Sequence, residues 1–175
     1  SLTHLFFNQH SKFDIPIDNL PGSLKFLYFG YVFNQKVDNL PNSITNLSFG
    51  HMFNQNIDNL PNSLTHLYFD CNFNQNIDNL PSSLTYLYFS NSSAFNQKID
   101  ELPKSLLHLR FGHHFSRNID NLPDSITDLI LGWGFREKIN KLPKSLKKLH
   151  LREFNRDVYL MTLKRKITFI SNYYY

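Results

Sequence analysis

The sequence predicts an all-β solenoid, in which about eight similar units stack so that their strands form one parallel sheet. Three observations support this prediction. A motif that begins with Ser recurs along the chain, its strand-like segment alternates inward and outward residues, and the units differ in length at a single point. The 175 residues include 17 Phe but only six Gly and one Trp, as expected when one short motif is copied many times.

The repeated motif is usually 20 residues long and can be written Ser-Leu-x-x-Leu-x-Phe-Gly-x-x-Phe-Asn-Gln-x-Ile-Asp-Asn-Leu-Pro-x. Two units have 22 residues, and their extra residues fall around Gln9–Lys12 and around Asn91–Ala94. A loop accepts changes in length more readily than packed strands do, so this point marks a surface loop. The units begin at Ser1, Ser23, Ser43, Ser63, Ser83, Ser105, Ser125 and Ser145.

The Leu-x-x-Leu-x-Phe part of each unit is typical of the strand in leucine-rich repeats. In the third unit, Leu47 and Phe49 alternate with outward neighbours, as expected for one face of a strand. Twenty residues leave no room for a full helix as well, so we expect an extended or 3₁₀ return limb with Phe53, Ile57 and Leu60 pointing inward. The Ser that follows each Leu-Pro-x is expected to hydrogen-bond its own local backbone in the turn.

Stacking is required because a single unit of this size cannot bury its own apolar face. At about 4.8 Å per parallel strand, eight strands span roughly 35–40 Å. The second Phe of each unit is expected to form an aromatic column in the core, at Phe33, Phe53, Phe73, Phe95, Phe115 and Phe135. The next residue is expected to form a structural ladder between units, at Asn34, Asn54, Asn74 and Asn96. We expect this ladder to lapse at Ser116 and Arg136, leaving the later units less regular.

We expect residues 1–155 to form the repeat array and residues 156–175 to form a C-terminal cap and tail. Near residue 155 the motif is lost, and two strand-like stretches follow at 158–160 and 167–170. At the other end, Leu2, Leu5 and Phe7 belong to a unit with no unit before it. Terminal units expose their core unless they are capped. We therefore expect an N-terminal cap before Ser1 in the complete protein, or self-association through the uncapped end.

Composition narrows the cellular setting and the class of partner. Cys71 is the only cysteine, no apolar run reaches the roughly eighteen residues of a membrane span, and no signal peptide is visible. We therefore expect a cytoplasmic protein that does not contact membranes. Residues 1–103 carry four Lys or Arg and eight Asp or Glu, whereas residues 104–175 carry fourteen and six. The basic end could attract nucleic acid or an acidic protein, or could keep the final edge soluble. Without a recognised nucleic-acid-binding fold, we do not expect a nucleic-acid partner.

The motif closely resembles the FNIP (or IP22) repeat of social amoebae and of mimivirus-type giant viruses. The resemblance rests on Phe-Asn-Gln-x-Ile-Asp-Asn-Leu-Pro-x-Ser-Leu-Thr-x-Leu-x-Phe-Gly and covers residues 1 to about 155. It implies a role in protein–protein interaction, in the host cytoplasm if the protein is viral. Members often carry an F-box, which binds a Skp1-type adaptor and makes the repeats the substrate receptor of a ubiquitin ligase. These 175 residues contain no F-box, so such an adaptor would bind only through a segment outside them.

Function is expected at the positions that change from unit to unit, because packing does not dictate them. Two outward columns of the strands vary freely, on the face that we expect to be concave. Aromatic and Arg side chains are enriched at interface hot spots, although aromatic residues also suit strands and pair across them. In the third unit the two outward positions are the polar residues Asn46 and Ser48, which interrupt the patch of aromatic side chains. The predicted site for an unidentified protein partner comprises Phe6, Phe26, Tyr28, His66, Tyr68, Tyr86, Tyr88, His108, Arg110, Asp128, Lys148 and His150.

We predict no catalytic residue, no metal and no cofactor. None of the eight His lies at ligand spacing from Cys or a carboxylate, and His4, His66 and His108 lie at least two strands apart, roughly 10 Å. An Asp that recurs from unit to unit is typical of turn chemistry rather than of an active site. Cys71 has no nearby base in the sequence, and no Gly-rich phosphate loop occurs. The alternative to a binding module is a structural, self-assembling protein such as a virion component.

Overall fold

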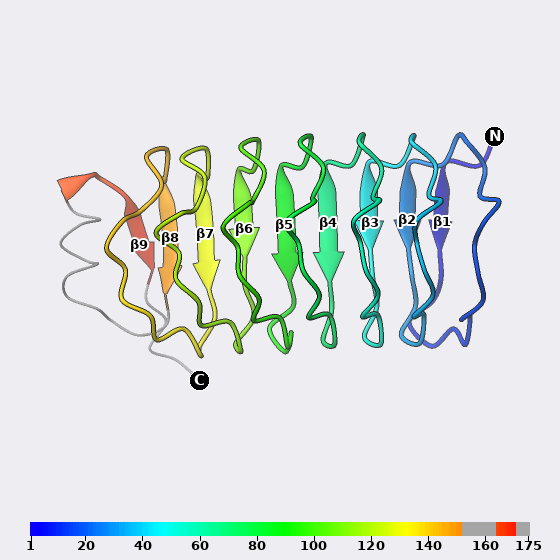
Figure 1. Cartoon of the computed structure of the whole chain (residues 1–175), viewed down its shortest axis with the longest axis horizontal. Helices are drawn as coiled ribbons and strands as arrows, with labels where there is room; N and C mark the ends of the chain where they lie inside the picture. The colour runs from blue at the N-terminus through cyan, green and yellow to red at the C-terminus, as the bar shows by residue number, and fades with distance from the viewer. Residues whose placement is uncertain (152–163, 171–175) are drawn as a thin grey trace.

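Nine strands form one sheet in the part of the chain that the computed structural model describes, residues 1–151 and 164–170 (Figure 1). They lie side by side in chain order, and each is parallel to its neighbour. The predicted all-β solenoid with a parallel sheet is confirmed. The strands are β1 (His4–Phe6), β2 (Phe26–Tyr28), β3 (Asn46–Ser48), β4 (His66–Phe69), β5 (Tyr86–Phe89), β6 (His108–Arg110), β7 (Asp128–Leu131), β8 (Lys148–Leu151) and β9 (Thr168–Ile170).

Each strand has only three or four residues, and from β2 to β8 its second residue is a fully buried Leu. The residues on either side of Leu47, for example, are half-exposed, which is the alternation that a half-buried strand requires. Between β1 and β8 the chain returns by extended segments and turns, without a helix or a 3₁₀ turn. The return limb therefore takes the extended one of its two predicted forms. Nor does any helix among the described residues have the length and apolar character needed to cross a bilayer.

The core contains two columns of Phe rings rather than the one predicted. The predicted column runs from Phe33 to Phe135, with ring centroids of successive units 6.1–6.4 Å apart. The second column, from Phe29 to Phe111, has successive centroids 5.4–5.6 Å apart. Within one unit, the two rings stack at 3.7–4.2 Å. Because each ring packs on rings of its own unit and of its neighbours, the burial of one unit depends on the next.

The asparagine side chains at the ladder positions form hydrogen bonds from unit to unit. In each case Oδ1 accepts the backbone N–H of the equivalent residue in the next unit at 2.9–3.0 Å, and the acceptors are Asn34, Asn54, Asn74 and Asn96. The predicted lapse at Ser116 is wrong, because Ser116 Oγ accepts the N–H of Arg136 at 3.0 Å. A hydroxyl oxygen is an acceptor just as an amide oxygen is. The ladder also begins one unit earlier than predicted, since the Asp14 carboxylate accepts the N–H of Asn34 at 2.8 Å.

Other recurring polar residues also link one unit to the next. The Ser that opens a unit donates from Oγ to a carbonyl of the preceding unit at 2.6–2.8 Å, as Ser63 does to Ile44. The prediction that this Ser bonds its own local backbone is therefore wrong, because stacking brings the neighbour's carbonyl within reach. The recurring Asp accepts from the Asn of the next unit, as Asp58 does from Asn79 at 2.9 Å. The repeated motif is thus a set of contacts between units as well as a set of turns.

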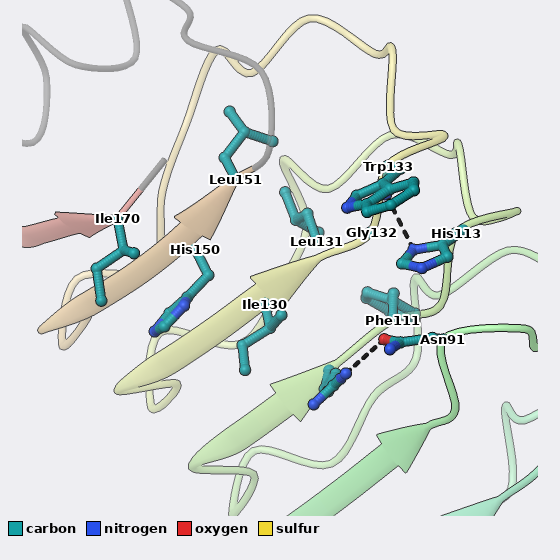
Figure 2. Close-up of a pocket in the computed structure, with 11 residues that line it drawn as sticks. Asn91, Phe111, His113, Ile130, Leu131, Gly132, Trp133, His150, Leu151 and Ile170 are labelled. Atoms are coloured by element: carbon teal, nitrogen blue, oxygen red, sulfur yellow. Dashed lines mark hydrogen bonds between the residues drawn. The ribbon is translucent and has the colours of Figure 1, made fainter. Parts of the chain in front are cut away.

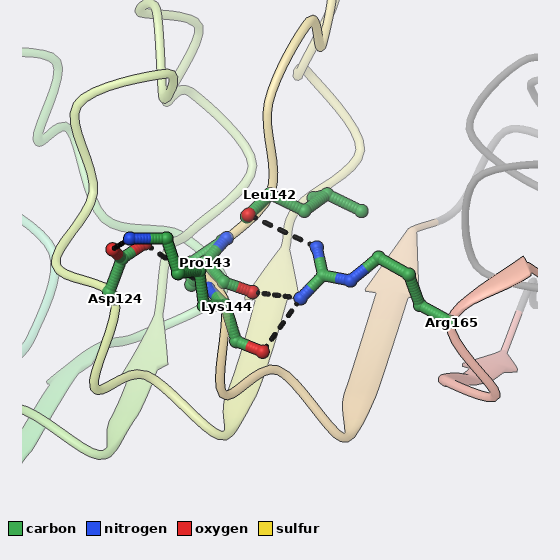
Figure 3. A network of polar contacts seen from close by, with 5 residues as sticks. All are labelled: Asp124, Leu142, Pro143, Lys144 and Arg165. Atoms are coloured by element: carbon green, nitrogen blue, oxygen red, sulfur yellow. Dashed lines mark hydrogen bonds and ion pairs between the residues drawn. The ribbon is translucent and has the colours of Figure 1, made fainter.

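At the C-terminal end, β9 extends the sheet and Arg165 binds the preceding return limb. The Arg165 guanidinium donates to the carbonyls of Leu142 and Lys144 at 3.1 and 2.8 Å, and also to that of Pro143 (Figure 3). In the same network, Lys144 pairs with Asp124 at 2.6 Å. Cationic side chains at this end therefore bind groups of the solenoid itself. The strand predicted at 167–170 is confirmed as β9, and the one predicted at 158–160 lies outside the described residues.

The Gly after β3 allows the loops of two neighbouring units to approach closely. A Cβ atom on Gly50 would lie 2.1 Å from the carbonyl oxygen of Gly30 and 2.6 Å from its carbonyl carbon. Both are backbone atoms, so the loop itself would have to move to accept a side chain. Gly22 differs, because a Cβ atom there would meet nothing within 4 Å.

We therefore expect Gly50→Ala to lower the free energy of unfolding by about 1–3 kcal/mol, the usual cost of overpacking. Gly22→Ala is the matched control, and we expect no loss, or a small gain because Ala restricts the unfolded chain. Urea unfolding followed by circular dichroism measures both variants. Equal free energies of unfolding for the two variants would contradict this role of Gly50.

A second prediction concerns the ladder. Asn74→Ala removes the acceptor for the N–H of Asn96 and for the side chain of Gln97, which now lie at 2.9 and 3.1 Å. We expect a loss of about 1 kcal/mol in the free energy of unfolding, the net worth of a typical hydrogen bond. Asn74→Asp keeps an acceptor, as Asp14 does in the first unit, and should retain most of the stability. A loss in the Asp variant as large as in the Ala variant, measured by the same unfolding experiment, would argue against the acceptor role.

Candidate interaction surface on the strand face

The outward residues of the strands form two columns on one face of the sheet, which we call the strand face. The pairing register aligns His4 with Phe26 and Phe6 with Tyr28. It continues strand by strand to β8 without a slip in either column. All the residues predicted to bind a partner therefore lie on this single surface. Their side chains are half-exposed or exposed, because the Leu between the two columns supplies the buried contact.

The rings on the strand face form two clusters instead of one continuous patch. In the N-terminal cluster, His4 stacks on Phe26 with centroids 4.3 Å apart, and Phe6 stacks on Tyr28 at 4.6 Å. Strand β3 follows, and its outward residues are Asn and Ser, which carry no ring. The strand face is therefore divided at β3, where the sequence predicted an interruption.

The larger central cluster spans β4 to β6. The Tyr86 ring lies between those of His66 and His108, with centroids 5.2 and 4.3 Å away, and Tyr68 contacts Tyr88 at 5.6 Å. Rings stacked at these distances hold one another in place, so they offer a partner contact area without a large loss of side-chain freedom. The central cluster comprises His66, Tyr68, Tyr86, Tyr88, His108 and Arg110.

Arg110 places a positive charge at the edge of the central cluster. Its guanidinium carbon lies 4.8 Å from the centroid of the Tyr88 ring, and its Nη2 donates to Oδ1 of Asn91 (Figure 2). Its Nε is buried and has no hydrogen-bond partner among the described residues. A buried N–H without an acceptor is costly. Arg110 also lines the hollows of the strand face, where its positive charge favours a ligand that brings a carboxylate to the guanidinium.

Next to the central cluster, Asp128 lies between His108 and Lys148 on the strand face. Its carboxylate lies 3.3 Å from Nδ1 of His108 and 3.7 Å from Nζ of Lys148, and it also accepts from the Thr127 hydroxyl at 2.6 Å. These side chains are at least a quarter exposed, so the pairs add little to stability. They arrange charged side chains along the outward column that contains His108, Asp128 and Lys148. This arrangement matters more for the choice of partner than for folding.

Partial burial favours the neutral forms of several groups on the strand face. Burial lowers the pKa of His66, and the positive charge that His108 can carry lowers it further. Burial also lowers the pKa of His150, where the Asp128 carboxylate opposes the effect. Burial raises the pKa of Tyr68, and three neighbouring Tyr residues add to this. At neutral pH these groups therefore act as neutral hydrogen-bonding groups rather than as charges.

A hollow of about 350 Å³ lies in the middle of the strand face. Its walls include the rings of Tyr68, Tyr86 and Tyr88, and Arg110 and Asp128 give it one charge of each sign. Apolar walls with a few charged groups are typical of a recognition site. The central cluster is thus hollowed rather than flat.

Two further hollows share lining residues with this one and therefore lie beside it. One, of about 380 Å³, shares Arg110 and reaches His150 and the loop residues His113 and Trp133 (Figure 2). The other, of about 340 Å³, shares Tyr68 and reaches the loops on the N-terminal side. Together they bring strand residues and loop residues into one surface.

The structure brings seven of the predicted partner-binding residues together around these hollows: Tyr68, Tyr86, Tyr88, His108, Arg110, Asp128 and His150. The other five lie on the strand face but do not line these hollows: Phe6, Phe26, Tyr28, His66, which stacks on Tyr86, and Lys148, which pairs with Asp128. A third variable column was not predicted. It lies in the loop two residues after the last inward residue of each strand and comprises Tyr31, His51, Cys71, Asn91, His113 and Trp133. Its members also stack, Tyr31 on His51 at 4.4 Å and His113 on Trp133 at 4.7 Å. A unit-by-unit comparison of the loops would have found it.

His51 also lies beside Asp70 and Cys71, and one ligand atom of each residue lies within 4.8 Å of the other two. The inference from spacing that no His lies near Cys or a carboxylate is therefore wrong, because stacking brings together residues that are about 20 positions apart. The Cys71 thiol donates to Asp70 Oδ1 at 3.2 Å. Burial raises the pKa of this thiol, and the hydrogen bond and charge of Asp70 raise it further. A thiol that is protonated at neutral pH is a poor nucleophile, so the geometry does not favour covalent catalysis.

Comparisons with known proteins agree with this architecture. A solved structure from the giant virus CroV, described as CroV588, a novel circular LRR protein, matches 97% of this chain at 36% sequence identity with a TM-score of 0.54. The predicted leucine-rich-repeat-like fold is thereby confirmed. This chain spans only 33% of that protein's length. Among curated proteins, none matches the chain.

The repeated motif identifies the family. The model described as FNIP Repeat matches residues 7–52, 33–60, 53–92, 95–134 and 118–154. These matches cover almost the whole array, including the recurring Asn and Ser that join the units and the Phe columns of the core. The chain belongs to the FNIP repeat family.

Proposed function

We propose that this chain is a protein-interaction module that binds its partner on the central part of the strand face. The observation that carries the proposal is the contrast between the two kinds of position in the unit. The constant residues hold neighbouring units together, whereas the variable residues form the central cluster and its three adjoining hollows. Stacked aromatic rings beside an arginine are typical of interface hot spots.

The charges of the site indicate what kind of surface it would bind. Arg110 brings a positive charge to the hollows, and the Tyr hydroxyls nearby can donate or accept. A partner with a carboxylate flanked by apolar side chains would satisfy the guanidinium and cover the rings. No covalent step is required, and we propose that the module is not an enzyme.

The cellular role that we propose is substrate recognition for an F-box-type ubiquitin ligase. Its support is the family resemblance, in which such repeats accompany an F-box that binds a Skp1-type adaptor. In that setting the strand face selects the substrate and the F-box, in another segment, joins the ligase. We also propose a cytoplasmic location, because a ubiquitin ligase receptor works there and the lone Cys71 needs no oxidising compartment.

The test is to replace the central rings and measure binding. We expect the triple variant Tyr68→Ala, Tyr86→Ala, Tyr88→Ala to keep the circular dichroism spectrum of the parent chain, since these side chains are half-exposed. The immobilised parent chain is used to capture proteins from a lysate of the source or its host. Calorimetry with the purified captured partner should then show an affinity more than about tenfold weaker for the triple variant.

Lys98→Ala, on the exposed return limb, is the control and should bind as the parent does. Equal binding by the parent and the folded triple variant would refute the strand face as the site. Co-purification of a Skp1-type adaptor with the captured complex would support the ligase role. If the adaptor is absent from a complex made with the full-length protein, the ligase role is refuted and the proposed interaction module stands without it.

A second candidate function is self-assembly, and one observation favours it. β1 is the first strand of the sheet, and apolar side chains near it are exposed: 59% for Phe6, 60% for Ile15 and 48% for Leu2. A strand edge beside exposed apolar side chains is a site at which another chain, or another part of the same protein, can add. A second copy, or another chain of the same type, is the occupant that fits such an edge.

If self-assembly occurs, the weight-average mass from light scattering should rise with protein concentration. Phe6→Ser combined with Ile15→Ser should reduce that rise, because it removes apolar surface at the edge. The matched control is Met52→Ser, an exposed apolar residue that lies away from β1. A monomer mass that stays constant across the concentration series would exclude this candidate.

A further inference from the structure

Stacking brings three side chains with metal-binding chemistry to one place in the loops after β3 and β4. His51 comes from the first loop, and Asp70 and Cys71 come from the second. One ligand atom of each lies within 4.8 Å of the other two, and all three residues are half-buried. Within residues 1–151 and 164–170 this is the only group of three such residues with that geometry.

The repeat itself does not require these side chains. Asp70 stands where the two preceding units carry Gly30 and Gly50, and Cys71 is the only cysteine of the chain. His51 and Cys71 occupy the same position in successive units, so the register of the solenoid places one above the other. One departure from the motif, Asp70, therefore meets two side chains at a variable position, and His51 comes from about 20 residues earlier in the sequence.

The surrounding contacts hold the three groups in place. The His51 ring stacks on Tyr31 at 4.4 Å with the planes 7° apart. The N–H of Asn72 donates to the carbonyl of His51 at 3.0 Å, which ties the two loops together. Cys71 Sγ and Asp70 Oδ1 are 3.2 Å apart. In a tetrahedral zinc site with bonds of about 2.3 Å to sulfur and about 2.0 Å to oxygen, these two atoms would lie roughly 3.5 Å apart.

A second observation concerns the neighbouring hydroxyl of Ser90, in the loop after β5. This hydroxyl lies next to the Cys71 thiol. Its Oγ is buried. His51, Asp70 and Ser90 also line the hollow of about 340 Å³ on the strand face.

We propose that His51, Asp70 and Cys71 bind one divalent transition-metal ion of the zinc type, with a fourth position open to the hollow. Thiolate, imidazole and carboxylate are the three ligand types that zinc prefers, and three protein ligands with one open position are typical of an exchangeable site. On binding, the thiol proton leaves to the solvent and the sulfur forms the bond to the metal. This site is independent of the proposed partner binding, although it opens on the same face.

The test uses cobalt(II), which reports on thiolate ligands by its absorption. The purified chain, with Cys71 reduced, should bind one Co²⁺ per chain and develop a near-ultraviolet thiolate-to-cobalt band. Cys71→Ser should lose the band, and His51→Gln should weaken Co²⁺ binding by more than about tenfold. Added Zn²⁺ should displace the cobalt and raise the melting temperature of the parent chain but not of His51→Gln.

The matched control is His113→Gln, which alters the equivalent loop position in the sixth unit, where the next unit has Trp133 instead of Cys. It should bind Co²⁺ as the parent does, and circular dichroism checks that every variant is folded. Should His51→Gln fail to fold, Asp70→Asn replaces it, with the same expected weakening. The proposal is overturned if no thiolate band forms, if the band forms equally in folded His51→Gln or Asp70→Asn, or if His113→Gln weakens binding as much.

Discussion

The stacking of one unit on the next at a constant register is the interaction on which the rest of this structure depends. The inward Leu and Phe residues of a single turn cannot exclude water by themselves, and the rings pack on those of both neighbouring units. The polar residues obey the same rule. The ladder amides, the opening Ser and the Asp–Asn pairs all have their partner in an adjacent unit. The stability of the solenoid is therefore a sum of contacts between neighbouring units.

This constraint explains why the functional surface is confined to a few positions. A constant residue that has a partner in the next unit can change only to a residue that keeps that contact, as Asp14 and Ser116 do in the ladder. The outward strand positions and the loop column carry no such obligation, and they differ from unit to unit. Their order along the stack then determines the chemistry of the surface: rings from β4 to β6, a division at β3, and charges from Arg110 to Lys148.

The basic C-terminal end is partly explained by the same structure. Arg165 satisfies carbonyls of the preceding return limb, and Lys144 pairs with Asp124. These two side chains serve contacts within the solenoid, which accounts for part of the positive charge of residues 104–175. The cation that stands in the proposed binding site is Arg110, which lies on the strand face and contacts Tyr88.

The sequence by itself determined the repeat length, the parallel sheet, the inward residues and the two outward columns, because each follows from a period that can be counted along the chain. It also located the asparagine ladder. Only the tertiary structure decided where side chains from different units meet. It showed that Ser116 continues the ladder, that the opening Ser reaches the preceding unit, and that the Tyr86 ring lies between those of His66 and His108. It also brought His51 to Asp70 and Cys71. The physical reason is that neighbours in a solenoid are one whole unit apart in the chain, so motifs based on short spacings cannot detect them.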